Sequence, residues 1–323
     1  MQSFESLYRL FEDYRHKHAP SAEPDELYEP IRYILNLGGK RIRPVLTLAG
    51  CALFNGNVRH ALPAAYAVEL FHNFTLLHDD IMDNARLRRH KPTAHLKFGI
   101  PRAILSGDVT LIYAYKFLSQ LPQKYIQPSF ALFNSTAIKV CEGQQFDMNF
   151  QHRQRITISD YLKMIEYKTA VLLACSLKLG AVVADASEKD ARLLYEFGRK
   201  IGICFQLMDD LLDAFGDEKK LGKTIGGDIA ENKKTFLLLK AMEQAKGKTK
   251  QKLLFCLTNN VPVEEKVSCV LNIYHQLNIR QITLHEITRL HKQALQHLSR
   301  IQAPEKNKAP LRSFAEALLT RQS

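Results

Sequence analysis

The sequence predicts an all-α protein, and three observations predict that class. Apolar residues recur at the three- and four-residue spacing of amphipathic helices along most of the chain. No stretch shows the alternation of apolar and polar residues expected of a strand. Glycine and proline are sparse, at 15 and 12 of 323 residues, which suits helices better than sheets or disorder. Since no linker divides the pattern, we expect one domain from residue 1 to residue 323.

Cysteine usage and hydropathy predict the compartment. The six cysteines are scattered without a Cys-x-x-Cys spacing, as expected of small buried hydrophobes in a reducing environment. The opening residues lack the apolar segment of a secretory signal. The most apolar run, 171–184, is interrupted by Ser176 and Lys178 and is shorter than the roughly 18 residues that a membrane span needs. We therefore expect a cytoplasmic protein with no membrane span.

The chain is basic, with a net charge of +12 and an isoelectric point near 9.3. Nucleic-acid binders share this range, but the basic residues are spread along the chain and no nucleic-acid motif accompanies them. We expect small anionic substrates and no nucleic acid. A general solubility charge is the alternative.

The first helices are predicted from apolar spacing and from the residues that end helices. A helix is expected within residues 4–14, a second over 25–37, and a third that begins near Pro44. Gly38 and Gly39 stop the second helix. The short connection between the second and third helices is rich in cations.

This connection places Lys40, Arg41 and Arg43 beside a helix N-terminus. Unpaired backbone N–H groups at such a terminus also favour anions, so the segment fits a phosphate site. A basic, solvated loop fits equally well. The segment alone does not decide between the two interpretations.

A carboxylate cluster follows in residues 72–95, with a DDxxD spacing on an apolar helix. Asp79 and Asp83 are four residues apart and share one helix face, with Asp80 between them. Two charges about 4 Å apart repel by roughly 4 kcal/mol at an effective dielectric near 20. Mg²⁺, which takes one or two carboxylates plus substrate phosphates, would offset that repulsion. A solvated helix end is the alternative for a single DDxxD.

The middle of the chain predicts further helices, over about 102–120, 128–148 and 159–184. The last of these carries Lys168 and Thr169 in apolar surroundings. A buried lysine is costly unless it meets an anion. A lysine whose charged end reaches solvent at the rim of the helix is the commoner explanation.

The DDxxD spacing then returns 130 residues after the first, with Asp209, Asp210 and Asp213 on another apolar helix. A glycine-punctuated loop with Lys223 and Lys233 follows it. Two such clusters, each followed by cations, predict an anionic ligand bridged by metal, and a diphosphate fits. The apolar interior would then hold a hydrocarbon tail. The pattern therefore predicts the ionisation of an allylic diphosphate. Residues 236–323 predict only further helices.

The ordered motifs of this chain resemble those of the trans-isoprenyl diphosphate synthases, or polyprenyl synthetases. They are GGKRIRP, HDDIMD with RRHKPT, EYKT, FQLMDDLLD and GKTIGGDIAENK, which together cover Gly38 to Thr235. The resemblance implies the isoprenoid synthase fold, a large helical bundle around a central apolar cavity, and usually a homodimer. It implies that isopentenyl diphosphate attacks C1 of an ionised allylic diphosphate, and that the released diphosphate takes the proton.

The resemblance also implies roles for individual residues. Three Mg²⁺ ions are expected, two on the first DDxxD and one on the second. The metal ligands would be Asp79, Asp83, Asp209 and Asp213. The allylic diphosphate would be held by Arg88, Lys168, Lys223 and Lys233, and isopentenyl diphosphate by Gly39, Lys40, Arg43, His72 and Arg89. The developing allylic cation would face Lys168, Thr169 and Gln206.

Product length is expected to depend on the residues that precede the first DDxxD. In the family, bulky residues four, five and eight positions before its first aspartate stop the growing chain, and here these are Thr75, Phe74 and Phe71. We expect a C20 product ahead of C15. Two departures, His90 and Asn232, stand where relatives often have glycine. The C-terminus LLTRQS lacks the strongly basic tail of some farnesyl synthases.

Two other functions are compatible with parts of this pattern. A class I terpene cyclase also ionises a diphosphate, but usually carries one DDxxD and has no use for the Lys40 and Arg43 loop. A non-catalytic subunit of a heteromeric synthase tends to lose an aspartate motif, whereas both are intact here. The sequence therefore favours a catalytic prenyltransferase.

Overall fold

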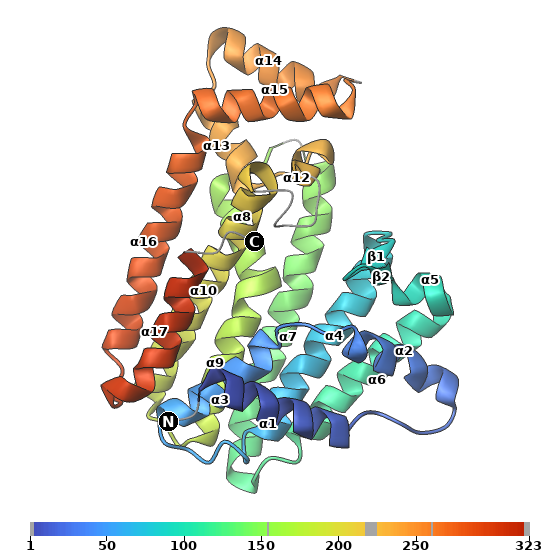
Figure 1. Cartoon of the computed structure of the whole chain (residues 1–323), viewed down its shortest axis with the longest axis vertical. Helices are drawn as coiled ribbons and strands as arrows, with labels where there is room; N and C mark the ends of the chain where they lie inside the picture. Colours follow the sequence, from blue (N-terminus) through green and yellow to red (C-terminus); the bar gives the residue numbers. More distant parts are fainter. Residues whose placement is uncertain (1–2, 154, 217–224, 260, 320–323) are drawn as a thin grey trace. The chain divides into compact units, whose positions relative to one another are not determined.

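The computed structural model describes residues 3–153, 155–216, 225–259 and 261–319 (Figure 1). These residues form helices almost throughout, which confirms the all-α class. In chain order the helices are α1 (Phe4–Lys17), α2 (Asp25–Asn36), α3 (Ile42–Leu53), α4 (Leu62–Met82), α5 (Ala94–Phe98), α6 (Ile100–Leu118), α7 (Gln123–His152), α8 (Ile158–Ile165), the π-helix η1 (Glu166–Ala170), α9 (Val171–Val183), α10 (Glu188–Phe215), α12 (Gly227–Ala230), α13 (Phe236–Gln244), α14 (Gly247–Thr258), α15 (Val263–Gln276), α16 (Ile279–Ser299) and α17 (Glu305–Leu319).

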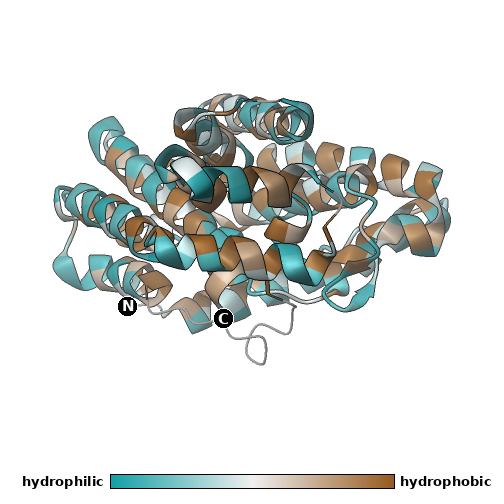
Figure 2. Ribbon diagram, turned by 90° about the horizontal axis from the view of Figure 1, so that it is seen from above, coloured by the Kyte–Doolittle hydropathy of each residue, from teal (hydrophilic) through white to brown (hydrophobic). Residues whose placement is uncertain are grey.

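The chain divides into two compact units. The first comprises residues 1–135, 175–194 and 302–310, and the second comprises residues 136–174, 195–301 and 311–323. Figure 2 shows apolar and polar stretches alternating along the helices, as expected when each helix buries one face. The first DDxxD motif lies in the first unit and the second motif in the second unit.

The first unit is organised around α4, which packs most extensively on α6 and also contacts α3. Residues 64–71 of α4 are buried on every side, which marks the helix as the centre of this core. Glycine permits close helix approach nearby, since a Cβ on Gly180 of α9 would lie 2.0 Å from the carbonyl oxygen of Thr47 in α3. The buried first half of α4 holds its polar C-terminal end in place.

The second unit contains the packed pairs α13–α16, α15–α16 and α14–α15. Gly202 in α10 lets that helix approach η1 closely, because a Cβ there would lie 2.5 Å from Cα of Ala170. The buried residues Leu207 and Leu211 of α10 flank the second DDxxD on the core side. This packing fixes the aspartates of α10 relative to η1.

The structure differs from the predicted secondary structure mainly at three places, two in helices and one in a short hairpin. The helix predicted over 128–148 extends to Gln123–His152, with Pro128 inside it. The helix predicted over 159–184 is interrupted by the π-turn η1. Strands β1 (Leu87–Arg88) and β2 (Lys91–Pro92) form an antiparallel hairpin after α4 that the sequence did not predict. Two-residue strands are too short to show any alternation.

Two global properties complete the fold. All six cysteines are free thiols. Across the described ranges, no helix combines the length and apolar character that crossing a bilayer requires.

Candidate active site

The first DDxxD lies at the C-terminal end of α4. Asp79 is half-buried, Asp80 is buried, and Asp83 is the exposed C-cap residue, whose N–H donates to the carbonyl oxygen of Asp79 at 2.8 Å. The helix ends here because Asn84 adopts a left-handed conformation, with φ of 48°. The three carboxylates therefore stand in different environments.

The side chain of Asp80 is fixed by hydrogen bonds to another side chain of the protein. Its carboxylate accepts hydrogen bonds from Nε of Arg88 at 3.1 Å and from Nη2 of the same guanidinium, so the two side chains form a forked ion pair. Asp80 is only 2% exposed, so this pair is shielded from solvent on the aspartate side. Arg88, expected to grip the allylic diphosphate, is thereby fixed beside the other two aspartates.

The β1–β2 hairpin presents Arg88 and Arg89. Its two turn residues, Arg89 and His90, have φ of 54° and 61°, the left-handed pair that tight hairpin turns require. Glycine adopts this conformation without steric cost, so it would fit at the position of His90. Thr93 closes the turn by donating its hydroxyl to the carbonyl oxygen of Ala85 at 2.8 Å.

The cationic connection before α3 contains residues of two kinds. Arg41 is buried and donates to Glu69 at 2.6 Å, to Glu12 at 3.2 Å and to the carbonyl oxygen of Leu35. The positive charge of Arg41 is balanced by the Glu69 and Glu12 carboxylates. Lys40, by contrast, is exposed. Arg41 is therefore a structural residue, which the sequence did not distinguish from its neighbours.

Gly39 brings this connection against the hairpin. A Cβ on Gly39 would lie 2.5 Å from Nη1 of Arg89, and its φ of 127° is one that residues with side chains rarely adopt. Glycine at this position therefore leaves room for the guanidinium. Gly39 and Arg89 are therefore in close contact, shortly before α3 begins at Ile42.

Arg43 and His72 are in direct contact. Nη1 of Arg43 lies 3.2 Å from Nε2 of His72, and because a guanidinium can only donate, the imidazole accepts through this nitrogen. Burial, followed by the charges of Arg43 and Arg89, holds the pKa of His72 well below its usual value. His72 is therefore neutral in the ordinary pH range.

The positive charge of this cluster is only partly compensated, because the Glu69 carboxylate beside it is already paired with Arg41. Burial lowers the pKa of Arg43 to about 10, with the Glu69 carboxylate opposing and the Arg89 guanidinium reinforcing that shift. Within the described part of the chain, Nε of Arg43 is buried without a hydrogen-bond partner. A buried donor with unbalanced positive charge around it favours an anion. The cluster of Gly39, Arg43, His72 and Arg89 thus has the chemistry of a phosphate site.

The second DDxxD, in the second unit, repeats the division among its aspartates. Asp210 is buried and accepts hydrogen bonds from the Tyr161 hydroxyl and from Nε2 of Gln206, the latter at 3.2 Å. Burial raises the pKa of Asp210 to about 7 despite the Tyr161 bond. Asp209 and Asp213 are only partly buried. Tyr161 was not identified from the sequence, where it is one tyrosine among twelve.

Lys168 and Thr169 lie in η1, a single π-helical turn. Such turns occur frequently at functional sites because they redirect side chains within a helix. Lys168 donates to Asp147 at 2.6 Å, and the Thr169 hydroxyl lies 3.4 Å from Oε1 of Gln206. Gly143 of α7 packs against the Lys168 backbone, where a Cβ would lie 2.2 Å from the nitrogen. Gln206 therefore connects Thr169 to Asp210.

The segment after α10 supplies a further cation. Nζ of Lys233 lies 3.2 Å from the Asp228 carboxylate, whose backbone N–H donates to Asp213 at 3.0 Å. Burial would lower the pKa of Lys233, but Asp228, Asp210 and Asp147 together raise it. Lys233 is thus charged and connected to the second motif through Asp228. Lys223 lies outside the described residues.

The predicted chain-length residues lie one and two turns before Asp79 on α4. Phe71 is buried, and its ring centroid lies 5.6 Å from that of the half-buried Phe74. Phe74 also meets His78 edge to face at 4.8 Å. The hydroxyl of Thr75 donates to the carbonyl oxygen of His72 at 2.8 Å. Two aromatic rings therefore stand behind the first DDxxD.

The donor set of each motif fits magnesium. Asp79 and Asp83 offer carboxylate oxygens one helical turn apart, as do Asp209 and Asp213, and Mg²⁺ prefers oxygen ligands. Among the described residues, no three His, Cys, Asp or Glu side chains are grouped so as to hold a metal by themselves.

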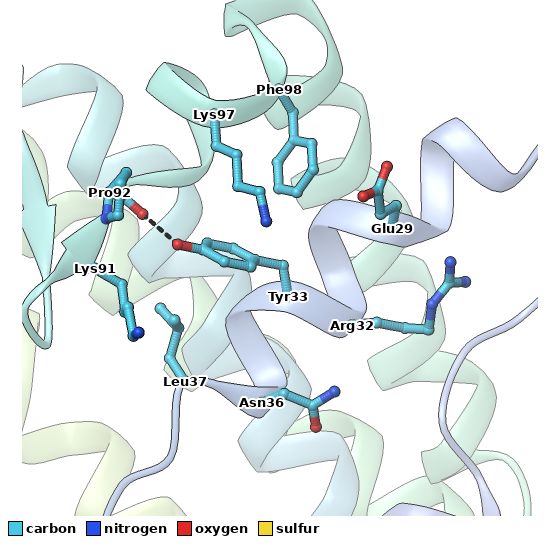
Figure 3. A pocket seen from close by; sticks show the side chains of 9 residues that line it. All are labelled: Glu29, Arg32, Tyr33, Asn36, Leu37, Lys91, Pro92, Lys97 and Phe98. Carbon is cyan, nitrogen blue, oxygen red and sulfur yellow. Dashed lines mark hydrogen bonds between the residues drawn. The ribbon is translucent and has the colours of Figure 1, made fainter.

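A recess elsewhere in the first unit takes no part in this site. It lies between α2, β2 and α5, and the Tyr33 hydroxyl donates across it to the carbonyl oxygen of Pro92 at 2.7 Å. Figure 3 shows Lys97 above the Tyr33 ring, Lys91 on its other side and Arg32 pointing away. These cations do not converge on one point, so the recess lacks the chemistry of a phosphate site.

Comparisons with known proteins agree with these features. A family model described as polyprenyl synthetase matches residues 24–274. The short chain isoprenyl diphosphate synthase of Methanocaldococcus jannaschii is 42% identical over 250 residues, which are 77% of this chain and 76% of that protein. The geranylgeranyl diphosphate synthase of Sulfolobus acidocaldarius is 40% identical over 263 residues, 80% of each chain.

Solved structures give the same result. A crystal structure of a geranylgeranyl pyrophosphate synthase superposes with a TM-score of 0.94 at 40% identity, over 100% of both chains. The geranylgeranyl pyrophosphate synthetase of Pyrococcus horikoshii gives 0.92 at 31% identity, over 98% of this chain and 97% of that one. The fold is thus the all-α isoprenoid synthase fold. The chain belongs to the polyprenyl synthetase family.

Proposed function

We propose that the chain is a magnesium-dependent trans-prenyltransferase that condenses isopentenyl diphosphate with an allylic diphosphate. Its relatives are named short-chain isoprenyl and geranylgeranyl diphosphate synthases, which supports this activity over the alternatives. One observation carries the residue assignment. In both motifs the second aspartate, Asp80 or Asp210, is buried in hydrogen bonds to the protein, while the first and last are more accessible.

In this proposal the accessible aspartates hold three Mg²⁺ ions, two at Asp79 and Asp83 and one at Asp209 with Asp213. When bound, the metal supplies Lewis-acid neutralisation of a departing diphosphate. Arg88, Lys168, Lys223 and Lys233 hold the allylic diphosphate. Arg88 is preorganised for this by Asp80, and Lys168 by Asp147, so each cation is positioned before the substrate arrives.

Isopentenyl diphosphate binds the cluster of Gly39, Lys40, Arg43, His72 and Arg89. The diphosphate accepts hydrogen bonds from Arg43 and Arg89 and balances their charge. Neutral His72 accepts from Arg43 and holds its guanidinium in place. In this arrangement the arginines bind the diphosphate, and Gly39 leaves room for the Arg89 guanidinium.

The chemistry requires no side-chain base. The C1–O bond of the allylic diphosphate breaks and the electron pair leaves with the diphosphate. The double bond of isopentenyl diphosphate forms a new C–C bond to C1, and the departing diphosphate takes the proton that is lost. Thr169 and Gln206 orient oxygen atoms toward the allylic cation and stabilise it electrostatically.

We propose a C20 product, with C15 second. In this proposal Phe71 and Phe74 limit the chain, with Thr75 beside them. The adjacency of the two rings, whose centroids lie 5.6 Å apart, supports the assignment. Relatives named geranylgeranyl diphosphate synthases support this length.

A homodimer, and a single functional domain from residue 1 to residue 323, belong to the same proposal. The α5–α6 segment exposes five large apolar side chains, an unusual number for a solvent-facing surface, and a second copy would cover them. These are Leu96, Ile100, Ile104, Leu105 and Ile112.

The match of the family model across both units supports the single domain. Six free thiols support a reducing compartment such as the cytoplasm.

The experiment is incubation of the purified chain alone with Mg²⁺, isopentenyl diphosphate and one of three primers, dimethylallyl, geranyl or farnesyl diphosphate. Linear all-trans prenyl diphosphates are expected. A cyclised hydrocarbon would identify a terpene cyclase instead. The absence of product with all three primers would identify a non-catalytic subunit.

A further inference from the structure

The outer face of α14 combines lysines with exposed apolar side chains. The helix and its N-cap contain four lysines within seven residues, at positions 246, 248, 250 and 252, and α14 contains no acidic residue. Phe255 is 57% exposed and Leu254 is 38% exposed. Lys248 and Phe255 are seven residues apart and therefore share one side of the helix, with Lys252 next to them. Leu254 is also exposed and lies about 100° around the helix from Phe255, on the neighbouring side. We call Lys248, Lys252, Leu254 and Phe255 together the α14 outer face.

The core side of α14 is already occupied. Leu253 and Cys256 are buried there, and the Cys256 thiol lies 2.7 Å from that of Cys269 in α15. Asn232, which follows α12, donates to the carbonyl oxygen of Leu257 at 3.3 Å. Figure 1 shows α14 and α15 side by side. The helix therefore needs no further partner to bury its core side, and its outer face is presented outward.

The lysines of this face carry unbalanced charge. Within the described residues, Lys246, Lys248, Lys250 and Lys252 form no ion pair with a carboxylate. The nearest acidic residues along the chain on either side are Glu243, which pairs with Lys240, and Glu264 with Glu265 at the beginning of α15. Even when Glu264 and Glu265 are counted, the pair of helices α14 and α15 keeps an excess of positive charge.

We propose that the α14 outer face binds the surface of an anionic lipid bilayer. Lysines near an anionic membrane are attracted to its headgroups, and an exposed aromatic ring gains by entering the interfacial region. A folded acidic protein would match the charge, but would not by itself explain an isolated Phe–Leu pair among lysines. The proposed function supplies a use, since prenyl diphosphates have an apolar tail that partitions into membranes.

The first test is sedimentation of the full chain with lipid vesicles. Binding is expected to vesicles of 30% phosphatidylglycerol in phosphatidylcholine but not to phosphatidylcholine alone, and to weaken as salt is raised. Lys248→Gln with Lys252→Gln should lower the partition coefficient roughly tenfold or more. The matched control, Lys189→Gln with Lys292→Gln, removes the same charge from exposed positions on α10 and α16 and should change it less than about twofold.

The second test uses the absence of tryptophan from the chain. Phe255→Trp places a single indole on the α14 outer face, and its emission should shift to the blue with anionic vesicles. Ile138→Trp, at a 61% exposed position of α7, is the control and should not shift. Neither position belongs to the proposed active site, so prenyl transfer in vesicle-free buffer should be unchanged.

Four results would overturn the proposal. The first is the absence of vesicle binding, and the second is equal binding to neutral vesicles. The third is a change from dimer to monomer, measured by light scattering, in Phe255→Ser. The fourth is that Lys248→Gln with Lys252→Gln loses binding to RNA but keeps its binding to vesicles. The third would assign the face to a contact between copies of the chain. Because vesicle binding needs no turnover, these outcomes are separate from a failure of the proposed function.

Discussion

The rings of Phe71 in α4 and Phe133 in α7 meet edge to face, with their centroids 5.3 Å apart. Phe133 meets Tyr115 of α6 in the same way at 5.3 Å. Phe71 is therefore supported by two neighbouring helices, whereas Phe74 is only half-buried and contacts Phe71 and His78. The two candidate chain-length residues should respond differently to truncation.

Phe74→Ala is expected to lengthen the prenyl product while leaving the fold intact, because it removes a ring that the core does not enclose. Phe71→Ala should instead cost about 3–5 kcal/mol of unfolding free energy, as for other buried phenylalanines. Chromatography of the products and urea denaturation measure the two effects. An unchanged product length in Phe74→Ala would show that this ring is only part of the core.

Gly39→Ala should weaken binding of isopentenyl diphosphate. The added methyl group would lie 2.5 Å from Nη1 of Arg89 and at a φ of 127°, so both the guanidinium and the backbone must move. We expect KM for isopentenyl diphosphate to rise at least about tenfold, with a smaller change in KM for the allylic primer. Steady-state kinetics with each substrate varied in turn checks this.

Gly38→Ala is the matched control for Gly39→Ala. Its φ is 87°, also left-handed, but a Cβ there meets no described atom within 4 Å. It shares the backbone cost without the clash, so it should change KM far less. Equal effects of the two substitutions would contradict the role given to Arg89.

His72 should make folding stability depend on pH below about 6.5. Its pKa is lowered in the folded protein, so the unfolded chain binds the extra proton there and stability falls as the pH is lowered. The contribution is up to about 1.4 kcal/mol per pH unit. His72→Asn should flatten the dependence of unfolding free energy on pH between roughly 6.5 and 5. Substitution of the exposed His60 is the matched control for the removal of a histidine.

The sequence predicted the fold class and the residue types of the site, because both depend on local patterns. Helical spacing, the two DDxxD motifs and the glycine–arginine loop are all visible in short windows. The motif resemblance then supplied the individual roles, since spacing alone does not separate Lys40 and Arg43 from Arg41.

What the sequence did not reveal depends on contacts between distant residues. Residue type and spacing do not separate Arg41 from Lys40 and Arg43. Its bonds to Glu12 and Glu69 show that it is structural. Tyr161 lies 49 positions from Asp210, its partner. The π-turn at Lys168 arises where Gly143 and Gly202 allow close helix approach. None of these has a local signature.

The most direct test of the account compares Asp79→Ala with the wild type in Mg²⁺-dependent prenyl transfer. Asp79 is proposed to be a metal ligand near the C-terminal end of α4, where it is more exposed than Asp80, the partner of Arg88. We predict that turnover falls by at least about a thousandfold, with the helical circular dichroism and the unfolding free energy near those of the wild type. Turnover close to wild type in a folded Asp79→Ala protein would contradict the metal role of the first DDxxD.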